Sequence, residues 1–490
     1  MSGRTFRQRR QRQRQHELAP NVKGRPSQGK EWVALREWCT AQGMPKSKLT
    51  LAYFPDTFRG MMATRNIEAD EEMIRVPEHM LMTASKVRRE VLARASDNGL
   101  VQSSAWRLSE HQALVYWTYD QRSKLGLSVW DTYVKTLPRD FSSVPLYVLS
   151  GTEPASSLSV NTDAEKWVAE HLPHSVLLKV TEQQERLFND WTCTCEVLTK
   201  FNIESPVDWR RYVWAWLVVN TRCIHLGRHT TGNQQSAVSS QPNSAVFQPI
   251  SDRDSMALAP MLDLLNHNCQ ARVSTYFDTG RRQFVIKTLR RYCKGEEAFI
   301  SYGPHDNGFM LAEYGFALAE NPHCALELDC KVEMWISTVK ANLNTRRARA
   351  TIKSTDVDAL VDVLKQHGLW GDFTLFSGSA ELPYRLQAAM YLVFAAMKHG
   401  AGIKGVISQW ERWQRGENTS VSEEVDLAVK NWVSRTCSEV AEHSSKMLDN
   451  IQAKQNDDAR GSECLDPFLV HCLRLIWTTI NKIAIESTSL

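Results

Sequence analysis

One segment of this 490-residue chain has an unusual pattern: APMLDLLNHNC, from Ala259 to Cys269. Its apolar run ends in Asn266 and His267, two polar side chains that must find hydrogen-bond partners if they are buried with their neighbours. Taken alone, the pattern is better explained by a satisfied core histidine than by a ligand site. The segments on either side of it therefore decide what it does.

A second conspicuous segment, FISYGPHDN at 299–307, follows the first, and Glu313-Tyr314-Gly315-Phe316 comes shortly after it. Tyr302 and Tyr314 each precede a glycine. A glycine after a strand lets the backbone approach a ligand closely. The two Tyr-Gly pairs therefore place phenol groups beside backbone that is able to contact a bound molecule.

Strand patterns occur in two clusters. The first covers 49–54, 60–63 and 72–76, and the second covers 272–277, 283–288 and 298–301. Each cluster is too small to form a domain alone, so we predict that the two fold together. The region between them, about 83–226, reads as a helical insertion, followed by a polar loop at 228–256 that is long enough to be a mobile lid.

Helical spacing of apolar residues predicts one helix before the strands, several within the insertion and several more at the end of the chain. The expected helices are 31–42, then 85–96, 109–121, 163–172, 177–202 and 207–222, and finally 332–343, 356–366, 384–398, 421–450 and 467–485. The fold class is therefore α+β, with a carboxy-terminal domain that we predict to be all-α over 325–490.

The order of these motifs resembles a known family. Asn266-His267, Glu296-Glu297 and Tyr302-Gly303 resemble the closing half of a SET domain, and the segment from Thr57 to Met61 resembles its opening strands. The insertion, with Trp130 to Pro138, and the helical carboxy-terminal region resemble the Rubisco large-subunit methyltransferase-like branch. This resemblance predicts a SET domain at 47–303 and a substrate-binding domain of that branch at 325–490.

The sequence departs from the family pattern at three places. Phe58 stands where a glycine is usual in the cofactor turn, two residues before Gly60, which predicts a less open turn. Gln270-Ala271 replace Pro-Asn after Cys269. The Cys-rich segment that follows many SET domains is absent, and Cys193 and Cys195 lack a second pair at zinc-ligand spacing, so we expect no metal.

The resemblance implies S-adenosyl-L-methionine as methyl donor and a protein lysine as acceptor. Tyr302 would be the catalytic tyrosine, with its hydroxyl facing the methyl-transfer point and the cofactor, and Tyr314 would line the lysine channel. The lysine must lose its proton, which costs about 4.6 kcal/mol at pH 7 for an ordinary pKa of about 10.4. An apolar channel beside a sulfonium lowers this cost.

The resemblance also implies the cofactor site. The main chain of Asn266 and His267 would hold the adenine, while Phe58, Arg59 and Gly60 would wrap the amino-acid end. Two further residues belong to this site. Arg222 would pair with the cofactor carboxylate or with substrate, as suits a planar guanidinium, although a structural ion pair is the alternative. Asp263 would either touch the cofactor or only brace the turn before Asn266.

Charge is unevenly distributed along the chain. Residues 1–30 contain nine Lys and Arg and one acidic residue, Glu17, so their net charge is +8. The whole chain has a net charge of +4, so the remaining residues have a net charge of −4. We expect a disordered basic arm that supports nuclear import or chromatin contact, or is only solvated. No unbroken apolar run reaches the length of a membrane span and no secretory signal begins the chain, so we expect no membrane partner. We also expect a monomer that is found in the nucleus and the cytoplasm.

The leading hypothesis is a protein-lysine N-methyltransferase that acts on a lysine-containing peptide, with a histone tail as a plausible substrate. Two alternatives stay open. The nucleophile could be a protein histidine, as known for a member of this branch. The chain could also be a catalytically silent binding scaffold, a possibility that Phe58 in place of glycine raises.

Overall fold

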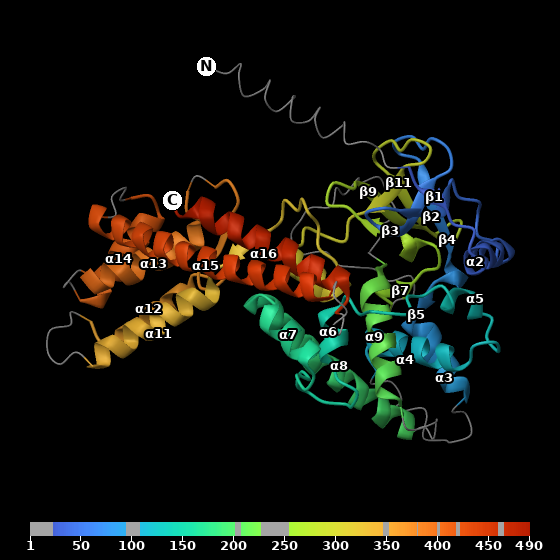
Figure 1. Cartoon of the computed structure of the whole chain (residues 1–490), viewed down its shortest axis with the longest axis horizontal. Coiled ribbons are helices and arrows are strands. Elements are labelled where there is room, and N and C mark those ends of the chain that lie inside the picture. The colour runs from blue at the N-terminus through green and yellow to red at the C-terminus, as the bar shows by residue number, and fades with distance from the viewer. Residues whose placement is uncertain are drawn as a thin grey trace, which may run out of the picture. The chain divides into compact units, whose positions relative to one another are not determined.

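The computed structural model describes residues 23–94, 108–200, 207–226, 254–345, 352–379, 381–398, 402–417, 422–458 and 465–490. These residues form two compact units. The first is made of the described parts of 1–141, 146–159 and 181–304, and the second of those of 142–145, 160–180 and 305–490. Figure 1 shows the strands of the two predicted clusters gathered in the first unit.

The largest sheet joins both strand clusters in the order β1-β2-β3-β11-β8. Its members are β1 (Arg25–Pro26), β2 (Leu49–Phe54), β3 (Phe58–Ala63), β11 (Glu297–Ile300) and β8 (Asn266–His267). β3 pairs antiparallel with β11, with Met61 opposite Ala298. β11 pairs parallel with β8, with Phe299 opposite Asn266. The prediction that the two clusters fold together across the insertion is therefore confirmed.

Two smaller sheets complete the first unit. One has the order β4-β10-β9, formed by β4 (Glu72–Pro77), β10 (Gln283–Thr288) and β9 (Val273–Asp278). The other, β5-β7-β6, is formed by β5 (Met82–Thr83), β7 (Met256–Leu258) and β6 (Ile224–His225). In β10 the apolar residues Phe284, Val285 and Ile286 are all buried, so this strand is covered on both faces.

The predicted helices are present close to their expected ranges, and two short helices of the insertion, at 131–134 and 145–149, were not predicted. Before and within the insertion they are α2 (Lys30–Ala41), α3 (Ala84–Arg94), α4 (Glu110–Ser123), α5 (Asp131–Val134), α6 (Pro145–Leu149), α7 (Asp163–His171), α8 (His174–Lys200) and α9 (Trp209–Arg222). A capping box between Ser109 and Gln112 starts α4, and the Asp208 side chain caps α9. Nine residues of α9 are buried, which makes it the core helix of the insertion.

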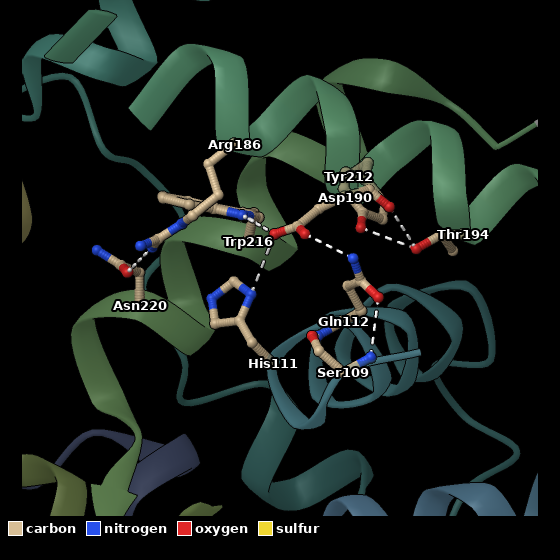
Figure 2. Close-up of polar contacts among 9 residues, drawn as sticks. All are labelled: Ser109, His111, Gln112, Arg186, Asp190, Thr194, Tyr212, Trp216 and Asn220. Carbon is tan, nitrogen blue, oxygen red and sulfur yellow. Dashed lines mark hydrogen bonds and ion pairs between the residues drawn. The ribbon is translucent and has the colours of Figure 1, made fainter. Parts of the chain in front are cut away.

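Three insertion helices meet around one buried carboxylate, Asp190 of α8 (Figure 2). Its Oδ1 accepts from Gln112 Nε2 at 2.7 Å, and its Oδ2 accepts from Trp216 Nε1 at 3.0 Å. His111 Nδ1 lies 3.4 Å from the same Oδ2. On a neighbouring turn, the hydroxyls of Thr194 and Tyr212 are 2.9 Å apart and hydrogen-bonded. Polar contacts therefore join α4, α8 and α9 inside an otherwise apolar core.

The second unit is mostly helical. Its helices are α10 (Asn307–Tyr314), α11 (Asp329–Thr345), α12 (Ser354–Gln366), α13 (Tyr384–Lys398), α14 (Ile403–Gln414), α15 (Glu423–Asp458) and α16 (Pro467–Ser487). Neither α10 nor α14 was predicted from the sequence. The region is also not purely α-helical, because β12 (Ala325–Glu327) and β13 (Thr374–Phe376) form a short antiparallel ladder. One apolar core, which includes Leu360, Leu392 and Val429, lies among these helices.

Among the described residues, one helix, α16, is long and apolar enough to cross a membrane. It packs closely against α15, and its buried residues include Leu469, Leu473 and Ile476. A core helix of a globular unit has the same length and composition, so this packing accounts for the apolar character of α16. The expectation that the chain has no membrane partner stays a prediction.

The predicted basic arm needs a correction. Residues 1–22 lie outside the described part of the chain, but residues 25–30 do not form a disordered tail. Arg25 and Pro26 pair with Tyr53 and Ala52 at the edge of the large sheet, and Gly24 N donates to Gly295 O at 3.0 Å. The backbone finds hydrogen-bond partners here despite the basic side chains. The predicted polar loop at 228–256 lies outside the described residues up to 253.

Candidate functional site

The turn between β2 and β3 keeps the backbone conformation that a glycine would favour. Phe58 has φ +58°, in the left-handed region, and its ring is 57% exposed. Phe54 and Phe58 are paired residues on either side of the Pro55-Asp56-Thr57 turn. The turn therefore forms with Phe58 in place of a glycine, and how open it is stays a prediction. The chain accepts local backbone strain there, since a bulky residue with positive φ is unfavourable.

Asn266 is bound to this hairpin by its side chain. Its Nδ2 donates to Arg59 O at 2.7 Å and to Glu297 Oε1 at 2.8 Å. Thr57 Oγ1 donates to the other oxygen of Glu297. A Cβ on Gly60 would overlap the Glu297 carboxylate, so a larger residue there would force that side chain out of its present position. These contacts place β3, Asn266 and Glu297 in one rigid arrangement.

Tyr302 is anchored to the same two-strand junction. Its backbone N–H donates to His267 Nδ1 at 2.9 Å, and its hydroxyl donates to Leu265 O at 2.8 Å. Because Nδ1 accepts a hydrogen bond, a neutral His267 imidazole carries its proton on Nε2. The two rings lie 5.2 Å apart. The histidine thus positions the tyrosine backbone, and Leu265 fixes the direction of the phenol.

Arg222 and Asp263 form a buried pair next to this junction. Arg222 Nη1 donates to Asp263 O at 2.7 Å and lies 3.9 Å from Oδ2, and the two side chains are 18% and 2% exposed. Burial raises the pKa of Asp263 to about 6, although Arg222 and Tyr133 act in the opposite direction. Asp263 Oδ1 and Arg222 Nε are buried, and no described residue forms a hydrogen bond with either atom.

Arg59 adds a second guanidinium to this pair. Its guanidinium lies 5.1 Å from the ring centre of Trp32, and its pKa is lowered by burial and then by Arg222. Two cationic side chains therefore share one carboxylate, Asp263, in a largely buried place. An anionic group of a ligand would balance this charge, and a carboxylate suits planar guanidinium donors.

The predicted site residues Phe58, Arg59, Gly60, Arg222, Asp263, Asn266, His267 and Tyr302 all lie in the first unit. Tyr314 belongs to the second unit, at the end of α10, where its ring lies 6.5 Å from Phe309 and 6.1 Å from Phe316. Burial raises its pKa to about 12, so the phenol stays protonated at neutral pH. Its role in a lysine channel stays a prediction.

Two residues of the site had no assigned role in the sequence analysis. Glu297 belongs to the Glu296-Glu297 pair of the closing motifs, but its contacts with Thr57 and Asn266 depend on how the strands pair. Tyr133 lies in the insertion, and its hydroxyl donates to Asp263 Oδ2 at 3.0 Å. The sequence motif could have pointed to Glu297. Tyr133 and Asp263 are 130 positions apart, and no periodic pattern in the sequence predicts that they meet.

The family relationship agrees with this geometry. Among the described residues, no group of three or more His, Cys, Asp or Glu side chains is placed to hold a metal ion. A family model described as the SET domain matches residues 59–303, half of the chain. The chain belongs to the SET domain family. The matched range contains every predicted site residue of this SET domain protein except Phe58 and Tyr314.

Curated relatives extend beyond the SET domain. The chain is 27% identical to mouse SET domain-containing protein 4 over 86% of its own length and 83% of the relative. It is 26% identical to the ribosomal lysine N-methyltransferase set11 of Schizosaccharomyces pombe over 69% of the chain and 68% of the relative. It is 25% identical to the actin-histidine N-methyltransferase of Xenopus tropicalis over 66% of the chain and 50% of the relative.

A solved structure shares the whole fold of this SET domain protein. The structure titled "Crystal structure of the SET domain of LSMT bound to Lysine and AdoHcy" superposes with a TM-score of 0.58 at 16% sequence identity. The match covers 95% of this chain and 91% of the other. The predicted fold, a SET domain interrupted by a helical insertion and followed by a helical region, is therefore confirmed.

Proposed function

We propose that this protein is an S-adenosyl-L-methionine-dependent protein-lysine N-methyltransferase. The observation that carries the proposal is the position of Tyr302, a phenol fixed by Leu265 O beside the Asn266-His267 strand in a SET domain. A relative that matches 69% of this chain supports it, since that protein is named as a ribosomal lysine N-methyltransferase. Solved structures of the same fold carry titles with lysine, AdoHcy or AdoMet.

The residues present fit such a cofactor. Within the described part of the chain, the buried atoms Asp263 Oδ1 and Arg222 Nε have no hydrogen-bond partner, which costs stability unless a ligand pairs with them. Arg222 and Arg59 would hold the carboxylate of its amino-acid end. The backbone of Asn266 and His267 would hold the adenine. When bound, the cofactor supplies an activated methyl group on a sulfonium.

The protein's own part in the reaction is to align groups and exclude water. Tyr302 is held by two hydrogen bonds, one at its backbone and one at its hydroxyl, so its ring has little freedom. A fixed phenol beside the reacting centre orients the incoming amine. The target lysine must arrive as the neutral amine, and burial beside a cation lowers the free energy needed to remove its proton.

The substrate is proposed more broadly than a single protein. A histone tail, chromatin contact through the basic residues 1–22 and a location in nucleus and cytoplasm are parts of this proposal. A ribosomal protein is an equally specific candidate, because the named function of the fission yeast relative points to one. The net charge of −4 over residues 31–490 suits a basic peptide of either origin.

Protein-histidine N-methylation is the second candidate, favoured by the relationship to an actin-histidine N-methyltransferase. A catalytically silent scaffold, motivated by Phe58 in place of a glycine, is the third candidate. The test is incubation of the purified chain with labelled S-adenosyl-L-methionine and, separately, histones, ribosomal proteins and actin. We expect methyl-lysine in peptide mass spectra, and its loss in Tyr302→Phe.

Methyl-histidine in those spectra would replace the lysine proposal by the second candidate. No methyl transfer to any protein, together with no binding of S-adenosylhomocysteine by calorimetry, would overturn both. Tyr292→Phe is a matched control, because Tyr292 is a buried phenol of the same unit. Among the described residues, its hydroxyl forms hydrogen bonds only with the backbone of Phe299. It should retain methyl transfer.

A further inference from the structure

Tyr133 connects the helical insertion to the candidate site. It lies on the one-turn helix α5, its side chain is buried, and its hydroxyl donates to Asp263 Oδ2 at 3.0 Å. Asp263 lies in the short 3-10 helix η2 (Leu262–Leu264), just before Asn266. The hydrogen bond therefore joins the insertion to the segment that precedes β8, the Asn266-His267 strand.

The Tyr133 ring is fixed by aromatic packing. It makes an edge contact with Trp130 at 6.3 Å between ring centres. Trp130 in turn contacts Trp117 at 5.5 Å and Trp38 at 5.4 Å. Edge and tilted contacts of this kind are favourable and hold rings in defined orientations. The position of the hydroxyl is therefore set by the packing of α2, α4 and α5 and not by the carboxylate that accepts its hydrogen bond.

The contacts on the Asp263 carboxylate are one-sided. Tyr133 and Arg222 both approach Oδ2, at 3.0 Å and 3.9 Å, while no hydrogen-bond partner of the buried Oδ1 is found among the described residues. An oxygen in this state is costly unless a donor reaches it. Because Oδ2 is held from two directions, the orientation of Oδ1 is fixed as well. Oδ1 is therefore available to a donor on a ligand.

We propose that Tyr133 is a positioning residue: its hydroxyl orients the Asp263 carboxylate so that Oδ1 accepts a hydrogen bond from an ammonium group of a ligand. This inference rests on the proposed function, in which two ammonium groups come near the site. One belongs to the amino-acid end of the methyl donor, and the other is the target lysine before it loses its proton. The chemistry that Asp263 recognises is the same for both.

The surroundings of Asp263 support a controlled charge. The facing titratable groups are Arg222 and Cys223 at the end of α9, Arg59 of β3, Cys39 of α2 and Tyr133 of α5. Burial, and then Asp263, raise the pKa of Tyr133 well above its ordinary value, so it donates throughout the neutral range. The Tyr133 hydrogen bond lowers the pKa of Asp263, so removing it should move that pKa upward.

The test is Tyr133→Phe, which keeps the ring and its packing and removes one hydroxyl. We expect S-adenosylhomocysteine, measured by calorimetry, to bind about tenfold more weakly, the size of one hydrogen bond to a charged group. The acid side of the binding profile should also move to higher pH. If the ammonium is that of the lysine, binding of S-adenosylhomocysteine is unchanged and KM for the substrate peptide rises instead. Either result supports the positioning role.

Tyr212→Phe is the matched control. Tyr212 is a fully buried phenol of the same unit whose hydroxyl bonds to Thr194 at 2.9 Å, away from Asp263. It should lose similar stability in thermal unfolding and bind ligand as the wild type does. In an Asp263→Asn background, Tyr133→Phe should have no further effect on binding, because the two residues act as one unit.

Two outcomes would overturn the inference. Unchanged S-adenosylhomocysteine binding together with an unchanged peptide KM in Tyr133→Phe would remove the positioning role. A full additional loss of binding in the Asp263→Asn background would show that Tyr133 acts elsewhere. A failure of the proposed function looks different, because the wild-type chain itself would then bind no S-adenosylhomocysteine.

Discussion

The side-chain amide of Asn266 donates to the Glu297 carboxylate at 2.8 Å and links the two parallel strands that carry the closing motifs of this SET domain. The same amide reaches Arg59 O, so the pair also fixes the opening hairpin. Burial raises the pKa of Glu297, although hydrogen bonds from Thr57 and Asn266 act against this. A single carboxylate thus organises three strands around the proposed adenine site.

Glu297→Gln should weaken binding of S-adenosylhomocysteine. The glutamine amide can accept at only one of its two ends, so either Thr57 or Asn266 loses its acceptor, and Asn266 becomes mobile. We expect a loss of about tenfold in affinity by calorimetry. Glu296→Gln is the control, because Glu296 lies next in sequence and accepts from Cys293 N at 2.7 Å. Equal affinities for both variants would contradict the bracing role.

Phe58→Gly should stabilise the protein. Phe58 has a positive φ, which is unfavourable for a bulky residue. The residue is 57% exposed, so removal of its ring loses little apolar burial. Relief of a left-handed conformation is worth about 1 kcal/mol for a non-glycine residue. Chemical denaturation should detect this gain. Phe58→Ala keeps the strain and should show no gain; an equal gain in both variants would assign the effect to the ring.

Most of the fold was predictable from the sequence because its signals are local. Alternating and helical patterns place β2, β10 and α9 within a few residues of their observed bounds. The motif Asn266-His267 with Tyr302 also follows from order along the chain, and the resemblance supplies the fold that brings them together. The short helices α5, α6 and α10 were missed, and so was α14, although Ile403, Val406, Ile407 and Trp410 stand at helical spacing in it.

The rest of the site depends on side-chain geometry. The left-handed Phe58 was not predictable, because a missing glycine usually signals a changed turn and not a strained one. The Tyr133 contact with Asp263 joins residues from different elements, and no spacing rule connects them. The edge strand β1 was not predicted, because the basic composition of its segment is typical of a disordered tail. Its backbone nevertheless pairs with β2.

Truncation at the amino terminus should separate location from folding. Deleting residues 1–22 removes most of the positive charge of the arm and leaves β1 in place, so ligand binding and thermal stability should be unchanged. Fluorescence microscopy should then show less of the protein in the nucleus. Deleting 1–30 also removes β1 and its pairing with β2, and should lower the unfolding temperature. Equal unfolding temperatures for the two truncations would contradict the structural role of β1.

The buried carboxylate of Asp190 should make stability depend on pH (Figure 2). Burial raises its pKa, but His111, Gln112 and Trp216 outweigh this, so the pKa lies below its ordinary value. A lowered pKa in the folded state stabilises the protein above the ordinary value of about 3.9, and this stabilisation is lost as pH falls further. Asp190→Asn should therefore destabilise the protein by about 3 kcal/mol at pH 7.

The difference between Asp190→Asn and the wild type should shrink as pH falls from about 5 toward 2, because the wild-type carboxyl then also becomes neutral. Urea unfolding at a series of pH values measures it. Asp163→Asn is the control, since its side chain is 95% exposed and 3.8 Å from Lys166, and exposed pairs contribute little. A difference that stays constant with pH would mean that Asp190 is neutral in the folded protein, and the network would then be held by packing alone.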